Sequence, residues 1–111
     1  MMDKISERLI CFNITKSLRE WDRGSVYECA RKFWRISKLK AEQADYCLAI
    51  SKGKVIAVYR PISWEVVESG EYKGRLLFNG TLVENSPYNN KDFSLEYEHV
   101  QNPVRYLGNW K

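Results

Sequence analysis

Five cationic side chains lie within the ten positions 31–40, and no acidic residue lies among them. They are Arg31, Lys32, Arg35, Lys38 and Lys40. Of the 18 lysine and arginine residues, 13 lie elsewhere and face 14 acidic residues, so the formal net charge of +4 comes from this stretch. A cation that neutralises a phosphate releases a counterion, and concentrated positive charge is typical of proteins that bind nucleic acids. The stretch therefore predicts a surface that holds a phosphate backbone.

The same charges also fit two other interpretations. Glu28 precedes Arg31 by three positions and Lys32 by four, and opposite charges at these spacings pair along an ordinary solvated helix face. An acidic protein partner is the third interpretation. Among the interleaved aromatics, Phe33 falls on the apolar stripe of the predicted helix, so Trp34 is the ring expected to be exposed for stacking.

A second group combines aromatic rings, arginines and an amide in segments that a curled sheet would bring together. Its members, with Trp34, form a candidate base pocket: Trp34, Tyr59, Arg60, Trp64, Asn102, Arg105 and Tyr106. Rings can sandwich a base while an amide and a guanidinium read its edge. In the alternative interpretation, Trp64 and Tyr106 are core aromatics. Arg60 and Arg105 then lie in surface ion pairs.

Strands are predicted to position most of these residues. The segments that are apolar or alternate between apolar and polar residues are 8–14, 46–50, 55–59, 62–67, 76–78, 81–83 and 104–107. The polar segment 51–54 joins two of them as a tight turn. Asn79 and Gly80 predict a second hairpin turn, because this pair tolerates positive φ.

One main helix is predicted to begin at Ser25. Ser25 and Glu28 have the spacing of a capping box, in which each side chain satisfies a backbone N–H of the first turn. Val26, Cys29, Ala30 and Phe33 form its apolar stripe. A second short helix is predicted within 38–44. The 111 residues therefore predict one α+β domain, with a small, bent, mostly antiparallel, barrel-like sheet.

The cysteine and histidine content disfavours a metal site. Cys11, Cys29 and Cys47 are odd in number, widely spaced and set in apolar runs, which is typical of buried, reduced thiols in a cytoplasmic protein. There is no CxxC motif, and His99 is the single histidine. We therefore expect no metal and no cofactor. No run is long and apolar enough to span a bilayer, so no membrane association is expected.

No catalytic motif is present in the sequence. It lacks a nucleophile elbow, a phosphate-binding glycine loop and a zinc signature. Pairs such as Lys54 with Glu65, or Lys91 with Glu96, are not selected by their spacing over the other charges. The sequence therefore favours a non-catalytic role, and enzymatic activity stays an open alternative.

A family resemblance covers nearly the whole chain from Leu9 onward. It rests on Tyr27-Glu28, Arg31, Trp34-Arg35, Ala44-Asp45-Tyr46, Leu48-Ala49-Ile50, Gly53, Val55, Val58-Tyr59, Trp64, Gly80 and Gln101-Asn102-Pro103-Val104-Arg105-Tyr106. This order resembles a module of bacterial and phage hypothetical proteins, which occurs alone and after GIY-YIG-type nuclease domains. The module is similar to the PUA-like β-barrels, which include EVE, ASCH, YTH and SRA-type readers of RNA or modified bases. The resemblance thus implies a PUA-like domain over 1–111, and without a nuclease domain we expect binding or inhibition.

Two functions follow from these observations. The first is a non-catalytic module that binds RNA or DNA and reads a modified or flipped base in the aromatic pocket. The second is a small inhibitor, of a phage type, that binds a nuclease or an RNA-processing enzyme of its host. The acidic segment 84–98 supports the second function, because its four carboxylates face only Lys91 and could imitate a nucleic acid. The sequence does not define the oligomeric state.

Overall fold

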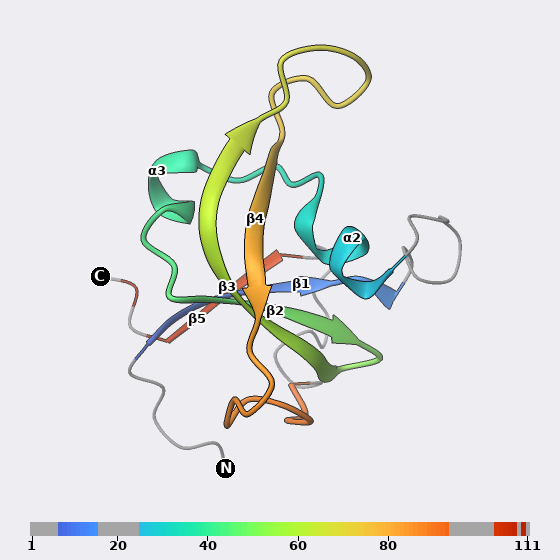
Figure 1. Ribbon diagram of the computed structural model, residues 1–111, viewed down its shortest axis with the longest axis vertical. Helices are drawn as coiled ribbons and strands as arrows, with labels where there is room; N and C mark the ends of the chain where they lie inside the picture. The colour runs from blue at the N-terminus through green and yellow to red at the C-terminus, as the bar shows by residue number, and fades with distance from the viewer. Residues whose placement is uncertain (1–6, 16–24, 94–103, 109, 111) are drawn as a thin grey trace.

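Five strands and two short helices make up the described part of the computed structural model (Figure 1). The structure describes residues 7–15, 25–93, 104–108 and 110. The strands are β1 (Arg8–Asn13), β2 (Tyr46–Ser51), β3 (Lys54–Val66), β4 (Leu76–Leu82) and β5 (Val104–Gly108), and the helices are α2 (Val26–Arg31) and α3 (Lys38–Ala41). Both predicted helices form, and each is shorter than its predicted range.

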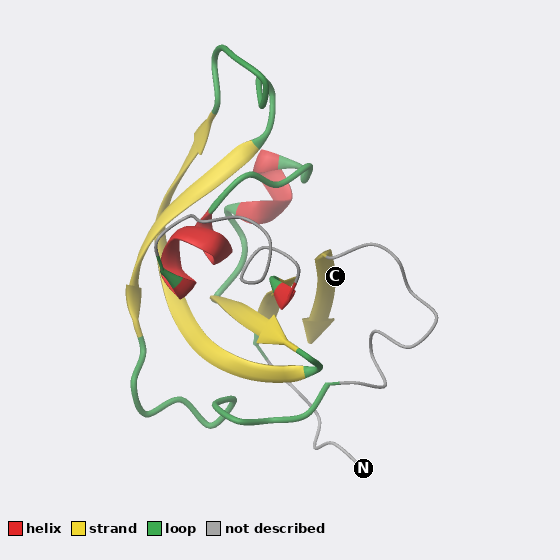
Figure 2. Ribbon diagram, turned by 90° about the vertical axis from the view of Figure 1, so that its right-hand side faces the viewer, coloured by secondary structure: helices red, strands yellow, loops and turns green. Residues whose placement is uncertain are grey.

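The strands form one mixed sheet in the order β4-β3-β2-β1-β5. Only β1 and β2 are parallel, because the chain between them crosses over through both helices. The other three strand pairs are antiparallel, as the sequence predicts. Figure 2 shows the sheet curving around the two helices. Among the described strands the sheet is open, with β4 at one end and β5 at the other.

Strand β3 produces much of this curvature. Its first half, up to Tyr59, pairs with β2, and its second half, from Tyr59 to Val66, pairs with β4. The predicted strands 55–59 and 62–67 are therefore one strand of 13 residues. The pairing with β4 shifts register between Pro61 and Ser63. A bulge at this position bends a strand, which explains why the sequence suggests two segments.

One predicted turn is confirmed and the other is wrong. The β2–β3 turn contains Lys52 at φ 53° and Gly53 at φ 83°. Asn79 and Gly80, by contrast, lie inside the continuous strand β4. Gly80 pairs with Pro61, and a Cβ at Gly80 would lie 2.6 Å from the carbonyl oxygen of Arg60. The glycine is thus required by close backbone approach and not by a turn.

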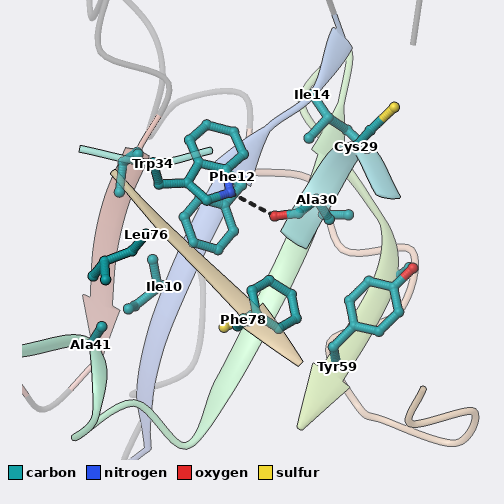
Figure 3. Packing of buried hydrophobic residues seen from close by; sticks show 14 of the residues in the cluster. Ile10, Phe12, Ile14, Cys29, Ala30, Trp34, Ala41, Tyr59, Leu76 and Phe78 are labelled. Atoms are coloured by element: carbon teal, nitrogen blue, oxygen red, sulfur yellow. Dashed lines mark hydrogen bonds between the residues drawn. The ribbon is translucent and has the colours of Figure 1, made fainter. Parts of the chain in front are cut away.

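Both faces of the sheet are covered by apolar residues. Ile10, Phe12 and Ile14 of β1 and its continuation belong to the core beneath the helices, which we call the helix-side core (Figure 3). Leu9 and Cys11 alternate with them and belong to a second core with Tyr88 and Phe93. We call this second group the loop-side core, because the segment after β4 supplies its last two members. Strands β1 and β2 are consequently short apolar runs with little alternation in burial.

The Ser25 half of the predicted capping box is confirmed, since its hydroxyl accepts a hydrogen bond from the Glu28 N–H at 3.1 Å, whereas the Glu28 carboxylate pairs with Lys32 and Arg31. The helix ends at Arg31, and Lys32 has extended backbone angles of φ −151° and ψ 155°. In extended backbone, successive side chains point to opposite sides. The residues after Arg31 are therefore not helical. The burial that the helical spacing predicted for them does not apply.

A short pairing fixes the segment after α2 to the outer edge of β4. Trp34 and Leu76 form an antiparallel bridge in which each backbone N–H donates to the carbonyl oxygen of the other at 2.8 Å. An unpaired strand edge leaves backbone polar groups without partners. This bridge satisfies two such groups at the start of β4.

Side chains of α2 satisfy further groups along the same edge. The Arg31 Nε–H donates to the Phe78 carbonyl oxygen at 3.0 Å, and Nη2 donates to the Asn79 side-chain oxygen at 2.6 Å. The Gly80 N–H donates to the Tyr27 hydroxyl at 3.0 Å. The helix is therefore bound to the edge of β4 by directed hydrogen bonds as well as by apolar packing.

The three cysteines are buried and none forms a disulfide, as predicted. Burial raises the pKa of Cys47 well above its ordinary value, with a further contribution from Cys11. Within the described part of the chain, no helix is long and apolar enough to cross a membrane.

The close approach at Gly80 predicts the effect of adding a methyl group there. We expect Gly80→Ala to lower the free energy of unfolding by about 1–3 kcal/mol, because the new Cβ meets backbone that must move. Thr81→Ala is the matched control in the same strand, and its cost is limited to less than about 1 kcal/mol by strand propensity. Urea denaturation measures both. Equal stability of the two variants would show that the approach at Gly80 is not restrictive.

Candidate nucleic-acid interface

Two of the five clustered cations are paired with the carboxylate of Glu28. Lys32 Nζ lies 2.8 Å from Glu28 Oε1, and Arg31 Nη1 lies 3.4 Å from the same atom. The hydrogen bond from Lys32 is the main cause of a lowered pKa at Glu28. The interpretation as an internally paired helix face therefore describes this end of the stretch. Arg31 is further committed to the fold by its hydrogen bonds to β4.

The remaining cations differ in their surroundings. Arg35 and Lys38 are exposed. The Lys40 ammonium lies 3.8 Å from the centroid of the Tyr106 ring and 5.4 Å from that of Trp110. A cation held over ring faces is stabilised there by their negative electrostatic potential. The five cations predicted to bind a phosphate backbone therefore fall into three groups: those paired with Glu28, those exposed, and one held over aromatic rings.

The expectation that Trp34 is an exposed stacking ring is wrong. Trp34 is 8% exposed, stacks on Phe12 at 4.4 Å, and donates its Nε1–H to the Ala30 carbonyl oxygen at 2.7 Å (Figure 3). The cause is the end of α2 at Arg31, after which the extended chain turns Trp34 inward. Phe33, predicted to be in the core, lies instead at the surface and is half-buried.

Phe33 forms a surface pair with a ring from a distant segment. Its ring is stacked on that of Tyr72, with the centroids 4.4 Å apart and the planes 13° apart. Lys32 Nζ lies 5.7 Å from the Phe33 centroid, and the Arg75 guanidinium carbon lies 5.2 Å from the Tyr72 centroid. Neither ring belongs to the helix-side or the loop-side core.

Further cationic residues flank this ring pair, and the exposed carboxylates of Glu68 and Glu71 lie in the same loop. Arg35 and Arg75 are the chain neighbours of the bridged residues Trp34 and Leu76, so the bridge brings these two cations to adjacent segments. Lys73, next to Tyr72, is exposed. We call this group the cation–aromatic patch, and it consists of Lys32, Phe33, Arg35, Tyr72, Lys73 and Arg75.

Sequence reasoning missed four of the six members of this patch, because it placed Phe33 in the core and did not select Tyr72, Lys73 or Arg75. Residues 72–75 combine a tyrosine with a lysine, a glycine and an arginine, which repeats on a small scale the aromatic–cation mixture of 31–35. This similarity is the sequence signal that could have indicated a second part of the surface. The two segments are nearly forty positions apart in the chain, and the bridge to β4 brings them side by side.

Two aromatic members of the predicted base pocket lie in the helix-side core. Tyr59 is 5% exposed and Trp64 is 7% exposed. Tyr59 packs against Tyr27 at 5.2 Å, and Trp64 packs against Phe78 at 5.3 Å. Burial raises the pKa of Tyr59 to about 12. The interpretation as core aromatics is confirmed for Trp64.

The other members lie apart from these rings. Arg60 is exposed, and its guanidinium is 3.4 Å from the Tyr46 hydroxyl. Arg105 pairs directly with Cys11 of the loop-side core, whereas its neighbour Tyr106 packs against the helix-side core. Asn102 lies outside the described residues. The described members therefore do not line one pocket, because adjacent strand residues alternate between two covered faces.

A separate recess lies beside α3, where β3 has left β2. It has a volume of about 270 Å³ and is lined by Glu42, Ala44, Pro61, Ile62, Ser63 and Trp64. The β3 bulge between Pro61 and Ser63 forms part of its lining. The carboxylate and the hydroxyl are hydrogen-bond acceptors, and the indole supplies a ring edge. Trp64 is thus the predicted pocket residue that borders this recess.

No cluster of three or more histidine, cysteine, aspartate or glutamate side chains with the arrangement of a metal site occurs within the part of the chain that the structure describes. Comparisons of the chain with protein-family models, curated proteins and solved structures give no match.

The contacts of Arg31 predict a structural effect for a substitution that keeps its charge. We expect Arg31→Lys to lower the free energy of unfolding by about 1–2 kcal/mol, because a single ammonium cannot reproduce the bonds to both Phe78 and Asn79. Arg35→Lys, at an exposed position, should change it by less than about 0.5 kcal/mol. Urea denaturation of the two variants checks this. A smaller effect at Arg31 than at Arg35 would contradict the assignment.

Proposed function

We propose that this chain is a non-catalytic nucleic-acid-binding module whose contact surface is the cation–aromatic patch together with Lys38. The carrying observation is that the Trp34–Leu76 bridge places Arg35 and Arg75 on adjacent segments, where like charges repel. A bound phosphate would relieve this repulsion. The exposed Lys38 and Lys73 are further cations in the chain segments that contain Arg35 and Arg75.

This proposal changes the predicted roles of the individual cations. Arg31 acts in the fold, and Lys40 is held by Tyr106 and Trp110. Lys32 lies between Glu28 and the Phe33 ring, so it can move toward a phosphate at the cost of one surface ion pair. Such a pair is worth less than about 1 kcal/mol.

The finer part of the proposal concerns base recognition. The resemblance to PUA-like readers of RNA or modified bases supports this part as an analogy of fold. Within it, a flipped base would enter the recess beside α3, where Glu42 and Ser63 could accept hydrogen bonds from its amino group and Trp64 would contact its edge. The ligand class covers RNA and DNA, and the proposed compartment is the cytoplasm.

A protein-binding inhibitor is the second candidate, and exposed apolar side chains near the recess favour it. Leu39 of α3 is 75% exposed, and Ile62 of β3 is 69% exposed. A purified protein partner that binds after nuclease treatment, and is lost with Ile62→Ser, would support this function. Loss of the partner with the nucleic acid would support the first proposal.

The binding test uses the two arginines of the bridge. We expect Arg35→Gln combined with Arg75→Gln to weaken binding to all sequences alike, and to lower the slope of log affinity against log salt by about one for each lost phosphate contact. Fluorescence anisotropy with labelled RNA and DNA oligonucleotides across a salt series gives both quantities.

Lys54→Gln is the matched control for this test, since Lys54 is exposed beside the β2–β3 turn, far from the β3–β4 loop (Figure 1). Its affinity and salt slope should equal those of the unmodified protein. If the unmodified protein binds no oligonucleotide at low salt, the proposed function is wrong.

A further inference from the structure

We infer that the cation–aromatic patch selects single-stranded nucleic acid, by stacking an unpaired base on the Phe33–Tyr72 pair. This inference rests on the proposed function and adds the class of its ligand. It begins from the position of the two rings, which are partly exposed and belong to neither core. Aromatic residues bury large areas and usually lie within a core. A parallel pair outside both cores can therefore stack on another planar group that displaces the cation over either ring.

The two rings are held in place by backbone hydrogen bonds on both sides. Phe33 directly precedes Trp34, whose backbone is bridged to Leu76. Tyr72 lies in the β3–β4 loop, where its carbonyl oxygen accepts from the Arg75 N–H at 3.0 Å. The loop is closed by bonds from the Val67 N–H to the Arg75 carbonyl and from the Gly74 N–H to the Val67 carbonyl. Stacking a base would therefore require little ordering of the protein.

The cations around the rings suit a strand with exposed bases. Arg75 lies over the Tyr72 ring and Lys32 over the Phe33 ring, and both side chains are flexible beyond Cβ. A base that takes the place of either cation on its ring leaves that cation beside the sugar–phosphate chain, where it can pair with phosphate. Both the ring and the charge then keep a favourable partner.

A duplex cannot make this contact without disruption. Its bases are already stacked and paired, so placing one on an external ring costs a few kcal/mol of unstacking. Unpaired bases have free faces, and every base has one, so stacking is largely independent of sequence. The patch should thus bind duplexes through charge alone and single strands through charge and stacking.

The test compares one labelled single-stranded oligonucleotide with the duplex of the same sequence at fixed salt. The unmodified protein should bind the single strand more tightly. Tyr72→Leu and Phe33→Leu should each weaken single-strand binding by about 10- to 100-fold, the effect of one lost base–ring contact, and leave duplex binding within about twofold. Tyr72→Phe keeps the ring and should bind as the unmodified protein does.

Each outcome decides a separate question. Equal binding of single strand and duplex by the unmodified protein overturns the inference and leaves the proposed function intact. A parallel loss of both ligands in Tyr72→Leu also overturns it, because the rings would then only position the cations. Circular dichroism confirms that each variant is folded, and Phe33→Leu replaces Tyr72→Leu if that variant is not. Failure of every oligonucleotide to bind rejects both proposals.

Discussion

The rest of this structure depends on one constraint, which is that the backbone groups at the outer edge of β4 need hydrogen-bond partners. A strand at the end of a sheet exposes backbone donors and acceptors that must find partners or meet water. Here the partners come from one short segment: the backbone of Trp34 and the side chains of Arg31 and Tyr27. Because these bonds are directional, they fix both the position of α2 over the sheet and the path of the chain that follows it.

The same constraint decides how the cationic stretch is divided. Arg31 is used for the β4 edge, and the turn of the chain at Lys32 sends Trp34 inward and Phe33 outward. The bridge also brings the β3–β4 loop beside this segment, so Tyr72 meets Phe33 although the two are far apart in the chain. The contacts that satisfy the edge of β4 thus also create a surface of rings and cations.

The curvature of β3 separates the predicted pocket from the proposed contact surface. A strand that pairs with β2 through its first half and with β4 through its second must bend, and a bulge near Pro61 allows it. The bend wraps the sheet around the helices, so its concave face is filled by Tyr59, Trp64 and Trp34. Those aromatics stabilise the core, and the recess beside Trp64 remains at the margin where β3 leaves β2.

The sequence by itself determined several local elements, because the cap at Ser25, the short apolar runs and the 51–54 turn are encoded by neighbouring residues. It also predicted the buried thiols and the segment with the excess of charge. Only the tertiary structure decided that Gly80 lies in a strand and that Phe33 is the surface ring. The physical reason is that close approach to Arg60 and pairing with Leu76 join residues far apart in the chain, and spacing along a sequence contains no record of such contacts.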